Sequence, residues 1–140
     1  MDITAIAARL SRIADALQAL QVWRELTLAE FLADSIIQLA TERQIQVAIQ
    51  AALDIGSILL AAASSQIPTT YKEIFTFLAN QQIIPLPLAE KLVRMAGFRN
   101  ILVHMYLDVD MSKLYQFLQN DLGDFEEYAH HVAEYLEKNH

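Results

Sequence analysis

Four polar side chains interrupt an apolar stretch of the chain, and their types suit proton transfer beside a phosphate group. The stretch covers residues 95–107, and its polar members are Arg99, Asn100, His104 and Tyr106. An imidazole with a pKa near neutrality can take the proton from a ribose 2′-hydroxyl. A guanidinium can hold the non-bridging oxygens while negative charge builds on phosphorus. With Arg99 and His104 as catalytic residues, this chemistry predicts RNA cleavage that needs no metal and leaves a 2′,3′-cyclic phosphate.

Helical geometry separates the guanidinium from the imidazole within one chain. Positions turn by about 100° per residue on an ideal α-helix, so Arg99 and His104 lie about 140° apart around the axis. Asn100, four residues before His104, is its neighbour and is expected to support the site. Two copies of this helix, packed across a symmetry axis, can build one groove in which the second imidazole protonates the leaving 5′-oxygen. We therefore expect a homodimer formed through this helix.

Charge is distributed unevenly along the chain. The formal net charge of −7 argues against nucleic-acid binding, because phosphate contacts dominate that affinity. Residues 91–107 nevertheless carry two arginines, one lysine, one histidine and no acid. Lys91 and Arg94 are best interpreted as a solvated face that can also guide RNA phosphates toward the groove. Arg99 must either pair or line a wet cleft, because an unpaired charge buried on an apolar helix is costly.

Composition places the chain among packed globular proteins. Its 140 residues fit one domain over residues 1–140, and hydrophobic residues make up 54%. Cysteine is absent, which excludes disulfides and thiolate metal sites. The chain starts without a secretory signal pattern, and charges break its apolar runs before about 18 residues, so no membrane span is expected. We therefore expect a cytoplasmic protein, and the proposed chemistry requires no cofactor.

One pair of residues matches the ligand spacing of a metal site in a helical bundle. Glu127 and His130 have the Glu-x-x-His spacing, but such a site needs a second set on a facing helix. The sequence supplies no second set, so no metal site is expected. His130 and the adjacent His131 lie about 100° apart on a helix and are interpreted as surface residues.

Hydrophobic periodicity predicts an all-α protein. The predicted helices cover residues 4–25, 28–33, 35–63, 70–80, 88–106 and 111–138. Two of them start at a capping-box spacing, Thr27 with Glu30 and Thr70 with Glu73. Gly123 is expected to bend or interrupt the last helix. Long amphipathic helices with short loops predict an up-and-down bundle of four long helices and one or two short ones.

The helix predicted over residues 35–63 has two clearly different faces. Its apolar stripe should enter the core and consists of Ile45, Ala48, Ile49, Ala52, Ile55 and Leu59. Its opposite stripe should stay wet and consists of Arg43, Gln46, Gln50, Asp54 and Ser57.

The motif and its surroundings resemble a known family. The string RNILVHMY at residues 99–106 resembles the HEPN signature of an arginine, a polar residue, three further positions and a histidine. The tyrosine two positions later resembles the HepT-type toxin branch. Three further features fit that branch: TERQIQVAIQAALDIG at 41–56, the spacing of Pro68, Tyr71, Phe75 and Leu78, and AGFRN at 96–100. The resemblance covers roughly residues 35–120.

This resemblance implies a HEPN-like fold, an activity and a partner. HepT-like proteins are dimeric ribonuclease toxins, and their usual partner is an MNT-type minimal nucleotidyltransferase antitoxin. The family's antitoxin adenylylates the tyrosine two residues after the histidine, which corresponds to Tyr106. Carried over, Arg99 and His104 are catalytic and Asn100 is supportive. Nucleotide phosphates added beside Arg99 would neutralise it and block the groove.

Two other functions stay open at the level of the sequence. The chain could be a non-catalytic HEPN scaffold that binds a nucleotidyltransferase and presents its substrate, although a scaffold need not keep both Arg99 and His104. It could also be an oligomerising helical bundle without a site. Arg99 and His104 would then be a structural pair that satisfies polar groups at a helix–helix contact, and Tyr106 would be an interfacial aromatic residue.

Overall fold

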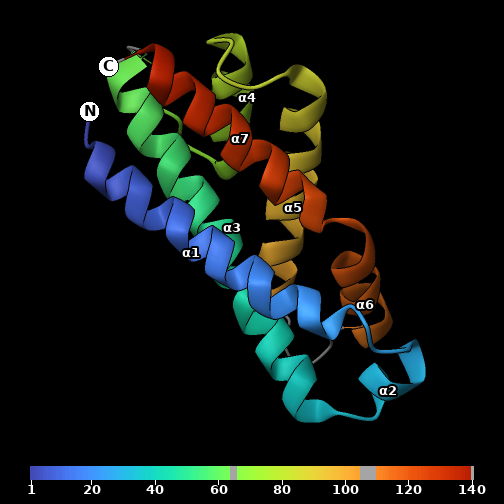
Figure 1. The fold of residues 1–140 in the computed structure, drawn as a ribbon. Helices are drawn as coiled ribbons and strands as arrows, with labels where there is room; N and C mark the ends of the chain where they lie inside the picture. Colours follow the sequence, from blue (N-terminus) through green and yellow to red (C-terminus); the bar gives the residue numbers. More distant parts are fainter. Residues whose placement is uncertain (64–65, 105–109, 140) are drawn as a thin grey trace.

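Seven helices and no strand make up the part of the chain that the structure describes (Figure 1). The computed structural model describes residues 1–63, 66–104 and 110–139, with the backbone alone for residues 100–104. The helices are α1 (Ile3–Trp23), α2 (Leu28–Leu32), α3 (Ser35–Ala63), α4 (Tyr71–Asn80), α5 (Leu86–His104), α6 (Met111–Asn120) and α7 (Leu122–Lys138). The predicted all-α class is confirmed.

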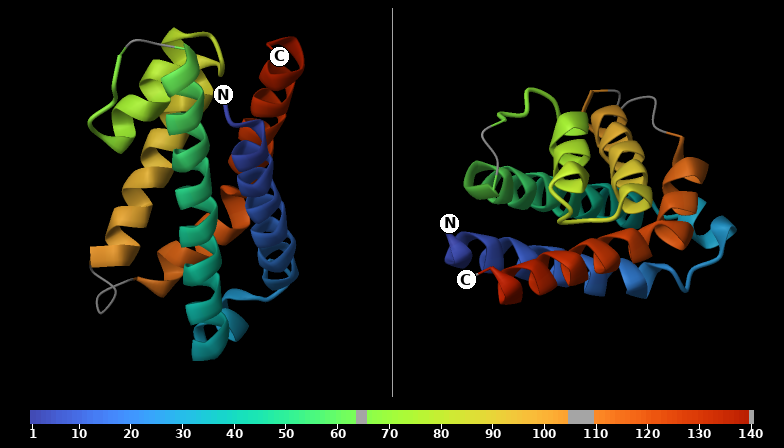
Figure 2. Two further views of the ribbon diagram at one scale, coloured as in Figure 1. Left: turned by 90° about the vertical axis from the view of Figure 1, so that its left-hand side faces the viewer. Right: turned by 90° about the horizontal axis from the view of Figure 1, so that it is seen from above.

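The helix α3 runs through the middle of the bundle. In the left view of Figure 2 it lies between α5 on one side and α1 on the other, and it packs against both. Seen from above, α1 and α7 lie side by side and cover α3, while α4 and α5 lie beyond it. The two chain ends meet at one end of the bundle, and α2 and α6 close the other (Figure 1).

The two predicted faces of α3 are confirmed. All six residues of its apolar stripe are buried, and the five residues of its polar stripe are exposed or half-buried. By length and composition alone α3 could also span a membrane. Core helices of globular proteins can be equally long and apolar, and 56% of the most apolar stretch of α3 is buried inside the bundle.

A buried tyrosine joins α7 to α3. The hydroxyl of Tyr128 donates a hydrogen bond of 2.8 Å to the carbonyl oxygen of Ala52. Its ring meets Phe75 edge-on, with ring centroids 6.0 Å apart. Burial raises the pKa of Tyr128 far above its usual value, so the hydroxyl stays a donor. Gly56, near this contact, lets α4 pack closely against α3, because a Cβ there would lie 2.5 Å from Cγ2 of Ile74.

The two predicted capping boxes differ in their second half. Thr27 accepts a hydrogen bond from the backbone of Glu30, and Glu30 accepts one from the backbone of Thr27, so the first box is complete. Thr70 accepts from the backbone of Glu73 at 3.1 Å, as predicted. The Glu73 carboxylate, however, accepts from the backbone of Thr69 instead of Thr70. Both helices therefore begin where the sequence predicts, and in the second Thr70 alone caps the helix while Glu73 accepts from the residue before it.

The helix predicted over residues 111–138 is interrupted, as expected, but at Asp121 and not at Gly123. The helix breaks at Asp121, and Gly123, the expected interruption, lies inside α7 in open space. The break lets α6 turn across the end of the bundle and bury Leu114 and Leu118 against α2 and α3, while α7 packs along α1 and α5. One straight helix could not bury both apolar faces, because they cover different sides of the bundle.

The helix that carries the motif starts two residues earlier than predicted. It begins at Leu86, and the backbone of Ala89 donates to the carbonyl oxygen of Pro85 at 3.0 Å. Pro87 is tolerated in the first turn because backbone N–H groups there have no partner within the helix. The described part of α5 ends at His104, so its predicted end at Tyr106 lies outside the described residues.

A buried carboxyl on α3 makes stability depend on pH. Glu42 is 9% exposed, makes no ion pair with any described residue, and has its pKa raised above 4.5 by burial. Ionisation costs more in the folded than in the unfolded chain, so stability falls as pH rises from about 4.5 through the folded pKa. We expect Glu42→Gln to raise the melting temperature at pH 7 and to lose this advantage below about pH 4. Exposed Glu90→Gln is the control, and equal melting temperatures of wild type and Glu42→Gln at pH 7 would contradict the expectation.

Candidate active site

The motif residues occupy the last turns of α5. The helix is continuous from Leu86 to His104, so the positions of Arg99 and His104 do lie about 140° apart around its axis. The side chains of Asn100 and His104 lie outside the described part of the chain, as does the whole of Tyr106. Within one chain the helix thus directs the arginine and the histidine positions to different sides.

Arg99 faces the polar stripe of α3. Its side chain is half-buried, and its Nη2 donates a hydrogen bond of 2.8 Å to Oε1 of Gln50. Its Nε is buried and has no hydrogen-bond acceptor among the described residues. Arg99 therefore pairs, as one of the two predicted alternatives requires, but its partner is the neutral amide of Gln50. No described acid compensates the charge of the guanidinium.

The contact continues across α3 to α1. Nε2 of Gln50 donates a hydrogen bond of 2.8 Å to Oδ1 of Asp54, one turn along the helix. Oδ2 of Asp54 lies 3.5 Å from Nε of Arg9 on α1, an ion pair without the angles of a hydrogen bond. The sequence signalled Gln50 and Asp54 only as members of a wet stripe, and nothing in it pointed to Arg9.

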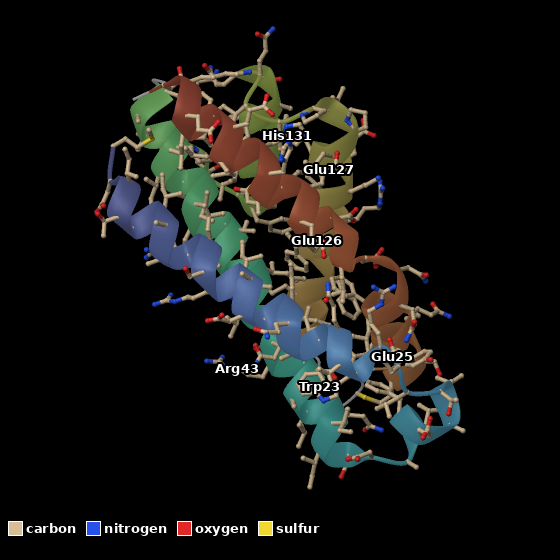
Figure 3. All side chains as sticks on the ribbon, viewed as in Figure 1. Trp23, Glu25, Arg43, Glu126, Glu127 and His131 are labelled. Atoms are coloured by element: carbon tan, nitrogen blue, oxygen red, sulfur yellow. The ribbon has the colours of Figure 1, made fainter. Side chains whose placement is uncertain are left out.

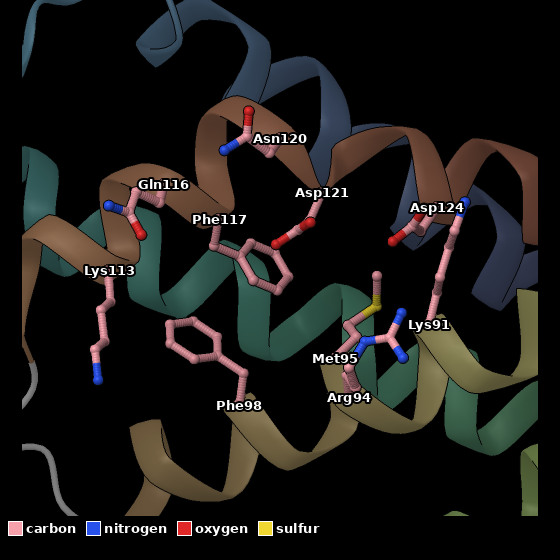
Figure 4. A pocket seen from close by; sticks show the side chains of 10 residues that line it. All are labelled: Lys91, Arg94, Met95, Phe98, Lys113, Gln116, Phe117, Asn120, Asp121 and Asp124. Carbon is pink, nitrogen blue, oxygen red and sulfur yellow. The ribbon is translucent and has the colours of Figure 1, made fainter.

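A pocket of about 500 Å³ lies on another side of α5, between α5, α6 and the start of α7 (Figure 4). Phe98 and Phe117 line it as stacked rings with centroids 5.0 Å apart and planes inclined by 15°. Lys91 and Arg94 line it from α5, and Lys113 lines it from α6. Adjacent positions on a helix lie about 100° apart, so Phe98 faces this pocket while Arg99 faces α3.

Two carboxyl groups face the cations of this pocket. Burial raises the pKa values of Asp121 and Asp124 above their usual range. The positive charges of Arg94 at both residues and of Lys91 at Asp124 act in the opposite direction. Lys91 and Arg94 are exposed, as expected for a solvated face. Because Asp121 and Asp124 line the same pocket, its charge is mixed and not purely positive.

The histidines of α7 behave as surface residues. His130 is exposed and lies 3.4 Å from Glu134, and half-buried His131 lies 4.0 Å from Glu127. Figure 3 shows His131 and Glu127 on the same helix, away from Arg43 on α3. Among the described residues no group of three or more histidine and acidic side chains could hold a metal ion.

Comparison with known proteins identifies the family. The family model for ribonuclease HepT-like proteins matches residues 7–132. The chain belongs to the HepT-like family. It is 32% identical to the tRNA nuclease HepT of Aphanizomenon flos-aquae over 131 residues, which are 94% of this chain and 89% of that protein. It is 30% identical to the mRNA nuclease HepT of Shewanella oneidensis over 100 residues, which are 71% of this chain and 75% of that protein.

A solved structure has the same fold as this HepT-like chain. It is the tri-AMPylated HEPN toxin of Shewanella oneidensis in complex with an MNT antitoxin, at a TM-score of 0.86 and 25% identity. The match covers 96% of this chain and 99% of that one. The predicted HEPN resemblance and the predicted class, a ribonuclease of the toxin–antitoxin type, are confirmed by these relatives. The roles of individual residues, the homodimer and the RNA substrate stay predictions.

Proposed function

We propose that this HepT-like chain cleaves RNA by metal-independent attack of a ribose 2′-hydroxyl, with Arg99 and His104 as catalytic residues. The observation that supports this most directly is the setting of Arg99. Its half-buried guanidinium is held by the neutral amide of Gln50 at 2.8 Å, and no described acid pairs with it. A fixed but uncompensated positive charge is what the growing negative charge of a phosphoryl transition state requires.

The proposed reaction has two proton transfers. His104 takes the proton of the 2′-hydroxyl while the 2′-oxygen forms a bond to phosphorus, and Arg99 binds the non-bridging oxygens. The bond from phosphorus to the 5′-oxygen breaks, and that oxygen receives a proton from a second imidazole. Because one chain carries one such histidine on a helix that separates it from Arg99, we propose that the second imidazole comes from a second copy of α5 in a homodimer. Asn100, beside His104 on the helix, supports this arrangement.

The proposed partner is an MNT-type nucleotidyltransferase that adenylylates Tyr106. Both proteins and their RNA substrate would meet in the cytoplasm. We expect coexpression with the cognate transferase to add mass in units of AMP to the wild type and to leave Tyr106→Phe unmodified, as read by intact-mass spectrometry. Tyr135→Phe, on α7, is the control and should be modified normally. Modification that persists in Tyr106→Phe would remove this assignment.

Lys91 and Arg94 are proposed to guide RNA phosphates from the pocket edge. We expect the variant with both Lys91→Ala and Arg94→Ala to bind RNA more weakly and with a smaller salt dependence. The slope of log affinity against log salt should fall by about 0.7 for each phosphate of a single strand that the variant no longer neutralises. Lys72→Ala, exposed on α4, is the matched control and should keep the full slope. An unchanged slope in the double variant would leave both residues as an ordinary solvated face.

A non-catalytic scaffold is the second candidate function. The acids Asp121 and Asp124, which face Lys91 and Arg94, favour it because they weaken the attraction for phosphates. The test is the incubation of purified protein with tRNA and mRNA, with and without divalent metal. Intact RNA in both cases, together with binding to the transferase, supports the scaffold, whereas cleavage without metal supports the nuclease.

A further inference from the structure

We propose that Gln50, Asp54 and Arg9 act as positioning residues that orient the guanidinium of Arg99 and leave its positive charge free to bind phosphate. We call this series of side chains, from Arg99 through Gln50 and Asp54 to Arg9, the polar relay. It joins three helices, because Arg99 lies on α5, Gln50 and Asp54 on α3, and Arg9 on α1. The proposal rests on the proposed function, since it assigns these residues to the phosphate-binding arginine of the cleavage reaction.

The first step of the polar relay is the orientation of an amide. A glutamine side chain has an oxygen that accepts and a nitrogen that donates, whereas a guanidinium only donates. Arg99 can therefore bond only to Oε1 of Gln50, which lies 2.8 Å from its Nη2. Asp54 selects that orientation, since its carboxylate accepts from Nε2 of Gln50 at 2.8 Å and could not accept from Oε1. The carboxylate thus points the amide oxygen toward α5.

The second step anchors the carboxylate itself. Nε of Arg9 lies 3.5 Å from Oδ2 of Asp54, and the side chains of the two residues are only 28% and 34% exposed. Nη1 of Arg9 also donates to the carbonyl oxygen of Ala5 at 3.1 Å, which ties the side chain to its own helix. Three side chains, each fixed at both ends, therefore connect α1 to the motif helix.

The third step concerns charge. A carboxylate in direct contact with Arg99 would neutralise the guanidinium that must bind phosphate. The polar relay places the neutral amide of Gln50 in that position. The acid, Asp54, lies on the far side of this amide from Arg99 and is paired with Arg9. The balanced pair leaves the charge of Arg99 available to an incoming phosphate, and the amide limits the directions in which the guanidinium can point.

Two substitutions at Gln50 separate these roles. Gln50→Glu keeps an acceptor for Arg99 but adds a negative charge, so we expect folded protein with a higher KM and a kcat/KM reduced about 10- to 100-fold. Gln50→Leu removes the acceptor without adding charge, so we expect mainly a lower kcat, by about 10-fold, because a misplaced catalytic group costs up to about 10²-fold. Asp54→Asn should lower kcat in the same way as Gln50→Leu, but by a smaller factor. Asp54→Glu, which keeps the carboxylate, should retain most of the wild-type rate. Gln46→Glu, one turn earlier on the same stripe, is the charge-matched control and should stay within about twofold of wild type.

The decisive measurement combines cleavage kinetics of full-length protein on RNA with the ¹⁵Nε–¹Hε NMR signal of Arg99. We expect this signal to shift in Gln50→Leu and Asp54→Asn and to stay in place in Gln46→Glu. Wild-type kinetics together with an unmoved signal in both Gln50 variants would overturn the polar relay. Equal loss of activity in Gln46→Glu and Gln50→Glu would also overturn it, because the effect would then be general charge. If the wild type leaves RNA intact, the proposed function fails, while the NMR signal still decides whether the polar relay positions Arg99.

Discussion

RNA cleavage by the His104→Ala variant is expected to fall about 10²- to 10⁴-fold, with little change in the affinity for RNA. The imidazole is proposed to move the protons of the reaction, and alanine offers no group that can replace it. The phosphate-binding charge of Arg99 stays in place, so substrate should still bind. The measurement is single-turnover cleavage of tRNA and mRNA without divalent metal, with the cyclic phosphate product identified by mass spectrometry.

A growth assay gives the same test inside cells. Expression of the wild type without its antitoxin should arrest growth, and expression of His104→Ala should not. His131→Ala, on α7 and remote from the motif helix in sequence, is the control and should behave as the wild type does. Growth arrest by a correctly folded His104→Ala protein would show that the toxicity has another origin than the proposed nuclease.

Loss of the guanidinium should have the second large effect. We expect Arg99→Ala to lower kcat/KM about 10²- to 10³-fold, the usual consequence of removing one donor that stabilises transition-state charge. Arg99→Lys should recover only part of this loss. A lysine keeps the charge but cannot reach Gln50 and two phosphate oxygens with one planar fork. The measurement is the same metal-free cleavage assay for both Arg99 variants, together with their affinities for RNA.

Mixed dimers test the proposed shared groove. Because that groove needs His104 of both chains, a dimer of one wild-type and one His104→Ala subunit should be nearly as inactive as the His104→Ala homodimer. Activity per wild-type subunit should therefore fall when an excess of His104→Ala subunits is exchanged into wild-type dimers. Unchanged activity per wild-type subunit in a preparation shown to contain mixed dimers would argue against a shared groove. Lys72→Ala subunits, which keep both motif residues, provide the control.

The helical periodicity of the chain was sufficient for most of the fold. The buried stripe of α3, the complete capping box at Thr27 and the starts of α2, α3 and α4 follow from residues within one or two turns of each other. Local sequence determines such features because a helix face repeats every three to four residues. The sequence predicted a break in the last helix at Gly123, but its position at Asp121 depends on which sides of the bundle α6 and α7 must cover.

The sequence by itself determined the motif, its place on a helix and the family to which the chain belongs. Only the tertiary structure decided what surrounds Arg99. Gln50 lies 49 residues before it and Arg9 lies on yet another helix, so their approach depends on the packing of α1, α3 and α5. Periodicity tells which face of a helix is wet, but it does not tell which neighbouring helix that face meets, because this is set by the three-dimensional fit of all the helices in one core.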